Sequence, residues 1–305
     1  MQIRVGRTGA LLLCASLACL AAAAPASATA GPSATGGPGL SRAGVRTPAR
    51  RVVRRARRAP PGGCYARSAI VLDPGTGQVL YEKNSGVAVP IASLTKLMTA
   101  LVFLEQKPQL DRIAEVTRED LRGAGHTRLR NREQVALGDL LHMSLMCSDN
   151  AATRILVRES GLDAEDYLAR MNQKALELGL THTRYVEFTG LDERNVSTAA
   201  DVARLLRIAA NHPTIHAISI TRSYEFRSAS RRHMVANTNR LLYGRYQVLG
   251  GKTGFIQESG YCLATWLRAQ GRDFIAVVLG APTNATRFAD VMRLVQKTLA
   301  SPSQS

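Results

Sequence analysis

The sequence has few aromatic residues and no metal-binding pattern. Phenylalanine, tryptophan and tyrosine make up 5% of the 305 residues, and tryptophan occurs once. The six histidines (126, 142, 182, 212, 216 and 233) are scattered, and neither His-Glu-x-x-His nor Cys-x-x-Cys is present. Because zinc and iron sites use ligands at such spacings, the sequence predicts no metal and no cofactor.

The five cysteines are too few and too unevenly placed for a disulfide framework. Cys14 and Cys19 lie in an N-terminal apolar segment, which leaves Cys64, Cys147 and Cys262. At least one of these three cannot pair within the chain, and the pairing of the others stays open. We expect buried apolar thiols, with a functional thiol near a catalytic site as the alternative for Cys147 or Cys262.

Acidic residues are missing before Asp73, and the chain begins with a basic and then apolar segment. Arg4 and Arg7, an apolar run over 11–24 and a small-residue site at 26–28 are typical of a secretory signal peptide spanning 1–28. The run is short for a retained membrane anchor, and residues 16–18 are a poor approach to a lipid-modified Cys19. We therefore expect export to the periplasm or the cell-envelope space.

Residues 29–62 are rich in Gly, Pro, Ser, Ala and Arg and predict a disordered linker. Eight arginines between residues 42 and 58 contribute +8 to the net charge of +17. Such a run can bind nucleic acid, but an exported chain meets little of it, so no nucleic acid partner is expected. Attraction to an anionic cell envelope and a merely solvated tail are the two interpretations left open.

From about residue 65 onward, apolar residues recur at the spacings typical of strands and helices. Strands are expected at 69–72, 78–81, 223–227, 248–255, 261–267 and 274–279. Helices are expected at 90–102, 137–146, 151–159, 164–178, 202–210 and 289–299. The polar, basic stretch 117–134 suggests a small protruding subdomain. This order predicts an α+β domain over 63–300, an antiparallel sheet flanked by helices with a mostly helical subdomain, and a tail at 301–305.

The expected helix at 90–102 places a hydroxyl beside an amine. Ser93 and Lys96 are three residues apart and project from one side of the first turn. A buried lysine tends to lose its proton, and a neutral amine beside a serine is a general base beside a nucleophile. Free N–H groups at the helix start favour negative charge developing near Ser93. The plain alternative is a helix N-cap at Ser93 and a solvated Lys96.

Two further motifs follow in order, Ser148-Asp149-Asn150 and Lys252-Thr253-Gly254. Taken alone, the first is compatible with a helix cap and the second with a glycine kink in a strand. Together with Ser-x-x-Lys they form the pattern of penicillin-binding proteins and class A β-lactamases. Chance agreement of all three in this order is a poor explanation.

From about residue 68 to 299 the chain resembles the low-molecular-mass penicillin-binding proteins, serine DD-peptidases of the D-alanyl-D-alanine carboxypeptidase family. Within that family it is most similar to the penicillin-binding protein 7 type of D-alanyl-D-alanine endopeptidase. The likeness is carried by residues 92–100, 172–179, 185–191, 195–199, 237–239 and 251–255. The sequence is too short for the β-rich second domain and membrane-binding C-terminal helix usual in the carboxypeptidase type, which favours the smaller endopeptidase-like type.

The resemblance implies three catalytic residues. Ser93 would attack the carbonyl carbon of a D-alanine and form an acyl-enzyme, with Lys96 as the neutral amine that takes its proton. Ser148 would relay a proton to the departing amine. The implied fold is that of the DD-peptidases and β-lactamases.

It also implies five substrate-binding residues. Asn150 would bond the substrate amide or hold the general base, and Lys252, kept charged by the incoming carboxylate, would bind that carboxylate with the help of Thr253. The strand containing Gly254 and Phe255 would lie along the substrate. The N–H groups of the nucleophile and of Phe255 would form the oxyanion hole.

The implied substrates are the peptides of peptidoglycan, and β-lactam antibiotics are the implied covalent inhibitors. A terminal D-Ala-D-Ala and a D-Ala-diaminopimelate cross-link both offer a carboxylate, so the choice between carboxypeptidase and endopeptidase stays open. One rival is a class A-like β-lactamase, which would need Glu187 to activate water. Because 187–191 lacks the Glu-x-x-Leu-Asn run of those enzymes, we interpret Glu187 as structural. A non-catalytic peptidoglycan-binding protein is the second rival.

Overall fold

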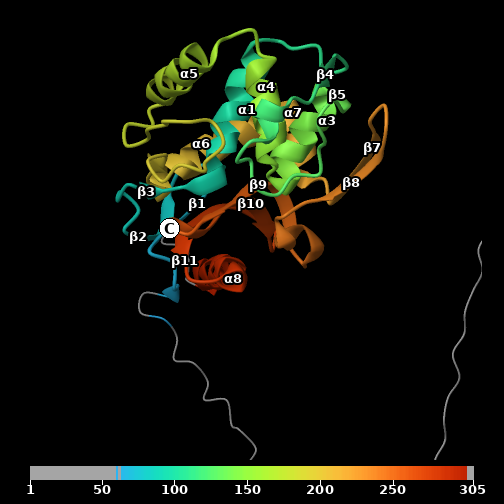
Figure 1. Ribbon diagram of the computed structural model, residues 1–305. Coiled ribbons are helices and arrows are strands. Elements are labelled where there is room, and N and C mark those ends of the chain that lie inside the picture. Colours follow the sequence, from blue (N-terminus) through green and yellow to red (C-terminus); the bar gives the residue numbers. More distant parts are fainter. Residues whose placement is uncertain (1–59, 61–62, 301–305) are drawn as a thin grey trace, which may run out of the picture. The chain divides into compact units, whose positions relative to one another are not determined.

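The computed structural model describes residue 60 and residues 63–300 (Figure 1). The predicted signal peptide (1–28), nearly all of the predicted linker (29–62) and the tail (301–305) lie outside the described residues. No helix within residues 63–300 is both long and apolar enough to cross a membrane.

A five-stranded antiparallel sheet forms the centre of the domain, in the order β2-β1-β11-β10-β9. Its strands are β1 (Ser68–Leu72), β2 (Val79–Lys83), β9 (Gln247–Ile256), β10 (Gly260–Ala269) and β11 (Arg272–Ala281). A two-residue turn joins β10 to β11, and both of its residues, Gln270 and Gly271, have positive φ. That geometry follows the right-handed twist of the paired strands.

Helices cover both faces of this sheet (Figure 1). The helices are α1 (Lys96–Glu105), α2 (Arg118–Leu121), α3 (Leu137–His142), α4 (Asn150–Arg158), α5 (Ala164–Glu177), α6 (Ala199–Asn211), α7 (Pro213–Ile220) and α8 (Asn284–Ala300). Helix α8 packs on one face, while α6 and α7 pack on the other. Residues of β11 alternate between two apolar cores, Ile275, Val277 and Leu279 in one and Phe274, Ala276 and Val278 in the other. Burial on both faces explains why the strand is a nearly continuous apolar run.

Three short strand pairs complete the fold. They are β3 (Val89–Pro90) with β6 (Val196–Ser197), β4 (Ile113–Glu115) with β5 (Gln134–Ala136), and β7 (Ser223–Arg227) with β8 (Arg232–Ala236). The stretch 117–134 carries α2 and packs beside the hairpin of β7 and β8, where a buried Glu133 oxygen lies 2.5 Å from Nε2 of His233. The predicted α+β fold with an antiparallel sheet and a helical region is confirmed.

Two predicted helices differ from the structure close to Ser93 and Ser148. The helix expected at 90–102 begins as a 3₁₀ turn, Ala92–Thr95, so that Ser93 precedes α1. The helix expected at 137–146 ends as α3 at His142 and continues as a π-helical turn, Met143–Cys147. Both irregular turns position serines, since Ser148 follows the second one directly.

Candidate active site

Ser93 lies in the 3₁₀ turn between β3 and α1, and two glycines press against it. A Cβ atom at Gly254 would lie 2.8 Å from the carbonyl oxygen of Ile91 and 3.2 Å from the backbone nitrogen of Ser93. A Cβ atom at Gly190 would lie 2.7 Å from that same nitrogen. The serine turn therefore fits between β9 and the 187–191 loop only because neither position has a side chain.

Lys96 is fully buried, and its amine has three polar partners. Its Nζ lies 2.6 Å from Oδ1 of Asn150, 2.5 Å from the carbonyl oxygen of Thr189 and 3.1 Å from Oγ of Ser93. All three partners are oxygens that can accept from the amine; once neutral, the amine can still donate to the oxygens of Asn150 and Thr189 and turn its lone pair toward the hydroxyl of Ser93. Burial lowers the pKa of Lys96 to about 7, against the opposing charge of Glu187. The geometry suits an amine that takes the serine proton.

Ser148 has a strained backbone that directs its side chain toward Lys252. It follows the π-helical turn with φ 64° and ψ 32°, in the left-handed region that costs a non-glycine residue about 1–2 kcal/mol. Its Oγ lies 2.9 Å from Nζ of Lys252. Asp149 then caps α4 by accepting from the N–H of Ala152 at 3.0 Å, and the cap places Asn150 at the first helical position.

Lys252 is 1% exposed and lies on β9, opposite Ala264 of β10. Besides Ser148, its amine has the carbonyl oxygen of Thr253 at 2.9 Å. Burial and the charge of Lys96 lower the pKa of Lys252 well below its ordinary value. A substrate carboxylate beside the amine would raise that pKa, so the expected charge on Lys252 depends on the carboxylate it binds.

The 187–191 loop is held in place by the carboxylate of Glu187. That carboxylate accepts from the N–H and hydroxyl of Thr189, both at 2.6 Å, and from the N–H of Gly190. It also accepts from the N–H of Leu191 at 3.1 Å and from Nδ2 of Asn195 at 2.8 Å. Five donors leave no free lone pair for a hydrolytic water, which favours the structural interpretation of Glu187.

Two residues near the site had no predicted role. Thr238 Oγ1 lies 2.6 Å from Oγ1 of Thr253, so the segment after β8 reaches β9. Arg287 of α8 is 6% exposed and donates to the carbonyl oxygen of Gly254 at 3.0 Å. Thr238 lies in a segment that carries the resemblance to the family. No sequence pattern points to Arg287, because only its burial distinguishes it from the other arginines and lysines of the chain.

The structure brings the predicted site residues together in two linked groups. Ser93, Lys96 and Asn150 form one group, and Ser148, Lys252 and Thr253 form the other. Gly254 joins them by packing on the serine turn. Phe255 follows directly, with its side chain 50% exposed and its ring stacked on Tyr261 at 4.2 Å.

Cys64, Cys147 and Cys262 are free thiols. Cys64 and Cys262 are buried, as expected for apolar thiols, whereas Cys147 is half-buried beside Ser148. Burial raises the pKa of Cys147 to about 11, so it is a poor nucleophile at neutral pH. Among residues 60 and 63–300, no group of His, Cys, Asp or Glu side chains is arranged to hold a metal ion.

Comparisons with known proteins identify the family and the fold. The family model described as D-alanyl-D-alanine carboxypeptidase, peptidase family S11, matches residues 55–283. The D-alanyl-D-alanine endopeptidase of Pseudomonas aeruginosa is 38% identical over 74% of this chain and 75% of its own length. The crystal structure of the Streptomyces K15 DD-transpeptidase matches with a TM-score of 0.74 and 25% identity, over 78% of this chain and 98% of that one.

Cefotaxime-bound penicillin-binding protein D2 of Listeria monocytogenes matches with a TM-score of 0.67 and 30% identity, over 77% of this chain and 98% of that one. The fold is thus shared along nearly the whole of both solved structures. With the family model covering most of the described domain, the chain belongs to the D-alanyl-D-alanine carboxypeptidase family of serine peptidases.

Proposed function

We propose that the enzyme cleaves D-alanyl bonds of peptidoglycan peptides through an acyl-enzyme on Ser93. The observation that carries this proposal is the position of the buried Lys96 amine, whose Nζ lies 3.1 Å from Oγ of Ser93 and is held by the oxygens of Asn150 and Thr189. Ser93 Oγ attacks the carbonyl carbon while its proton passes to Lys96 Nζ. The C–N bond then breaks, and the departing amine takes a proton through Ser148. Water hydrolyses the resulting ester and releases the serine.

The second amine provides selectivity for a substrate with a carboxylate beside the scissile bond. Lys252 Nζ has two oxygen partners from the protein, and an ammonium group has three hydrogens, so one is left for a ligand. Thr253 lies beside it on the strand that would run along the substrate. The N–H groups of Ser93 and Phe255 are assigned to the oxyanion, where one donor is typically worth about 3 kcal/mol.

Fluorescent penicillin tests the nucleophile assignment. Labelling of the wild type and its loss in Ser93→Ala are expected, whereas Ser85→Ala, at a serine outside the site, should label normally. Equal labelling of all three proteins would exclude Ser93 as the nucleophile. Rapid release of hydrolysed penicillin, instead of a long-lived acyl-enzyme, would favour the β-lactamase alternative.

We further propose that the physiological bond is the D-Ala cross-link, so that the enzyme is an endopeptidase. Support comes from the endopeptidase of Pseudomonas aeruginosa, the similar relative described above. Digestion of purified cross-linked muropeptides should convert dimers to monomers. Loss of terminal D-alanine with the dimers intact would show a carboxypeptidase instead, and no change with either substrate would favour a non-catalytic peptidoglycan-binding protein.

Export and envelope binding are proposed from the sequence outside the described residues. We infer export from residues 1–28, and attraction of the arginine-rich 29–62 segment to the anionic envelope. Deleting 29–62 should weaken retention of the protein on isolated cell walls and leave penicillin labelling intact. Loss of labelling in the deletion protein would contradict the assignment of this segment as a linker.

A further inference from the structure

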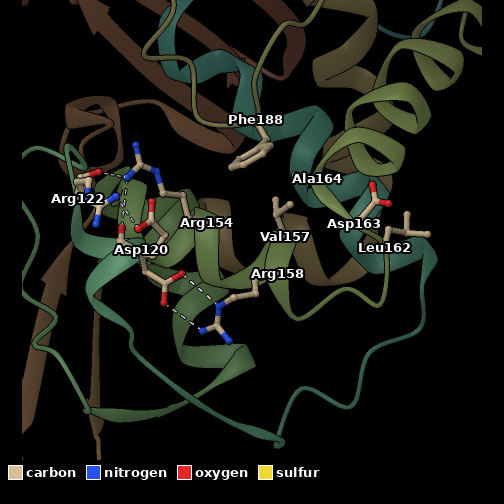
Figure 2. Close-up of a pocket in the computed structure, with 10 residues that line it drawn as sticks. Asp120, Arg122, Arg154, Val157, Arg158, Leu162, Asp163, Ala164 and Phe188 are labelled. Atoms are coloured by element: carbon tan, nitrogen blue, oxygen red, sulfur yellow. Dashed lines mark hydrogen bonds and ion pairs between the residues drawn. The ribbon is translucent and has the colours of Figure 1, made fainter.

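A second pocket, of about 590 Å³, lies in the helical region outside the site at Ser93 (Figure 2). Its walls come from α2, α4, the start of α5 and the loop carrying Phe188. Among the residues that line it are Arg122, Arg154, Val157, Leu162, Ala164 and Phe188. None of the eight residues predicted for the active site lines this pocket. Its volume is in the range of small-ligand sites, about 300–1,000 Å³.

The carboxylates around the pocket already have partners. They pair as Asp120 with Arg158 at 3.1 Å, Glu119 with Arg122 at 2.9 Å, and Asp163 with the N–H of Asp166 at 2.7 Å. Two of these three carboxylates are therefore compensated by arginines, and the third, Asp163, is occupied as the N-cap of α5.

Arg154 is the contrasting case. Its Nη1 donates to the carbonyl oxygens of Arg122 and Asp120, and no carboxylate among residues 60 and 63–300 pairs with it. Neither Nε nor Nη2 of Arg154 has a hydrogen-bond partner in that part of the chain. A half-buried guanidinium with unused donors, beside a pocket, suits a carboxylate or another planar anion.

The opposite side of the pocket is mainly apolar, with Asp163 as the exception. Figure 2 shows Arg122 and Arg154 at one end, Leu162, Ala164 and Asp163 at the other, and Phe188 facing the space above Val157. An occupant that places an anion on Arg154 would therefore lay short apolar groups against these side chains. A peptide ending in a small apolar residue with a free carboxylate has both features.

Two elements that line the pocket, α4 and the loop carrying Phe188, also carry partners of Lys96. Arg154 lies one helical turn after Asn150, whose Oδ1 contacts Lys96. Phe188 precedes Thr189, whose carbonyl oxygen contacts the same amine. Arg154 is also one of the charges that lower the pKa of Lys96, so an anion bound there would weaken that effect.

We propose that this pocket is a second ligand site, distinct from the site at Ser93, for a peptide ending in D-alanine with a free carboxylate held by Arg154. The choice of a D-alanyl peptide rests on the proposed function, since substrates and products of that reaction carry such ends. The charge and shape of the pocket do not depend on it. Occupancy would couple to catalysis through Phe188 and the neighbouring carbonyl of Thr189.

Calorimetric titration of N-acetyl-D-alanyl-D-alanine into enzyme already acylated by benzylpenicillin tests the proposal, because the acyl group then blocks the site at Ser93. Binding is expected, and the C-terminal amide of the same peptide should bind at least tenfold more weakly. Arg154→Gln should weaken binding about tenfold, whereas Arg118→Gln, an exposed arginine of α2 outside the pocket, should not. Ala164→Phe should block the pocket without removing the hydrogen bonds of Arg154.

Binding to free but not to acylated enzyme would overturn the second site and leave the proposed function standing. Equal affinity for acid and amide, or normal binding by both Arg154→Gln and Ala164→Phe, would also overturn it. If benzylpenicillin fails to acylate the enzyme, the proposed function fails instead, and the same comparison of variants on the untreated protein still decides whether the pocket binds the peptide.

Discussion

Replacing Glu187 by glutamine tests whether the 187–191 loop holds the general base in place. Oε1 of Glu187 faces three donors, the N–H groups of Gly190 and Leu191 and the side chain of Asn195, while Oε2 faces the N–H and hydroxyl of Thr189. Glutamine keeps one acceptor oxygen, which serves the three donors. Its NH₂ group is then directed at the N–H of Thr189, where two donors oppose each other.

The expected cost follows from counting these bonds. The hydroxyl of Thr189 can rotate to accept from the new amide, so the bond lost is that of the Thr189 N–H. A hydrogen bond to a charged group contributes about 1.5–3 kcal/mol, and we expect Glu187→Gln to lower the free energy of unfolding by that amount. Because the carbonyl oxygen of Thr189 lies 2.5 Å from Lys96 Nζ, the maximal acylation rate should fall by about 10–100-fold.

The pH dependence of acylation provides an independent test, because the direction in which it shifts can be predicted. Glu187 raises the pKa of Lys96, which burial lowers to about 7. In the proposed mechanism Lys96 accepts a proton only when neutral, so we expect acylation to increase as the pH rises through this pKa. Without the carboxylate the pKa is lower still, and the acid limb should move to lower pH. The measurement is the acylation rate constant with fluorescent penicillin across about pH 5 to 9, with thermal unfolding in the same buffers.

Glu193→Gln is the matched control, because it makes the same chemical change at an exposed position near this loop. It should leave both the acid limb and the Tm unchanged. An acid limb in Glu187→Gln that stays in place or moves to higher pH would refute the electrostatic reasoning. An unchanged Tm would refute the anchoring role.

Acylation of the wild type should fall by half near pH 7 on its acid side, and a rate that is constant from about pH 5 to 8 would contradict a neutral Lys96 as the base. Gly254→Ala places a Cβ 2.8 Å from a backbone oxygen beside Ser93 and should slow acylation about 10²–10³-fold in stopped-flow assays, while Gly86→Ala, with open space around it, should not. Glu133→Ala leaves the buried ring nitrogen of His233 without its partner at 2.5 Å, and should lower the free energy of unfolding in urea by about 3 kcal/mol. A loss no larger than that caused by Glu225→Ala, at an exposed position, would count against this prediction.

Periodicity was sufficient to predict the parts of the fold with a simple environment. Strands β10 and β11 are apolar on both faces, and they and β9 each lie within three residues of their predicted ends. Helix α5 has one apolar face and was equally well predicted. The closeness of Ser93 and Lys96 also follows from local spacing, since it needs only one helical turn.

Features that depend on distant contacts were not predictable in the same way. The 3₁₀ turn at Ser93 packs against Gly190 of the 187–191 loop and Gly254 of β9, which are far from it in the sequence. Helix α7, which begins at Pro213, lacks a clear polar face and was missed. Arg287 is one of 40 lysines and arginines in the sequence, and only packing places its guanidinium against the carbonyl oxygen of Gly254 in β9.

The contacts of the two lysine amines join segments far apart in the chain. Lys96 touches residues 54 and 93 positions away, and Lys252 touches one 104 positions away. Closing such long loops comes late in folding, so a half-folded chain has an ordinary serine with no base to activate it. The fraction of a preparation that takes up a β-lactam should accordingly equal the fraction that has reached the native state, which makes the antibiotic a folding probe as well as an inhibitor.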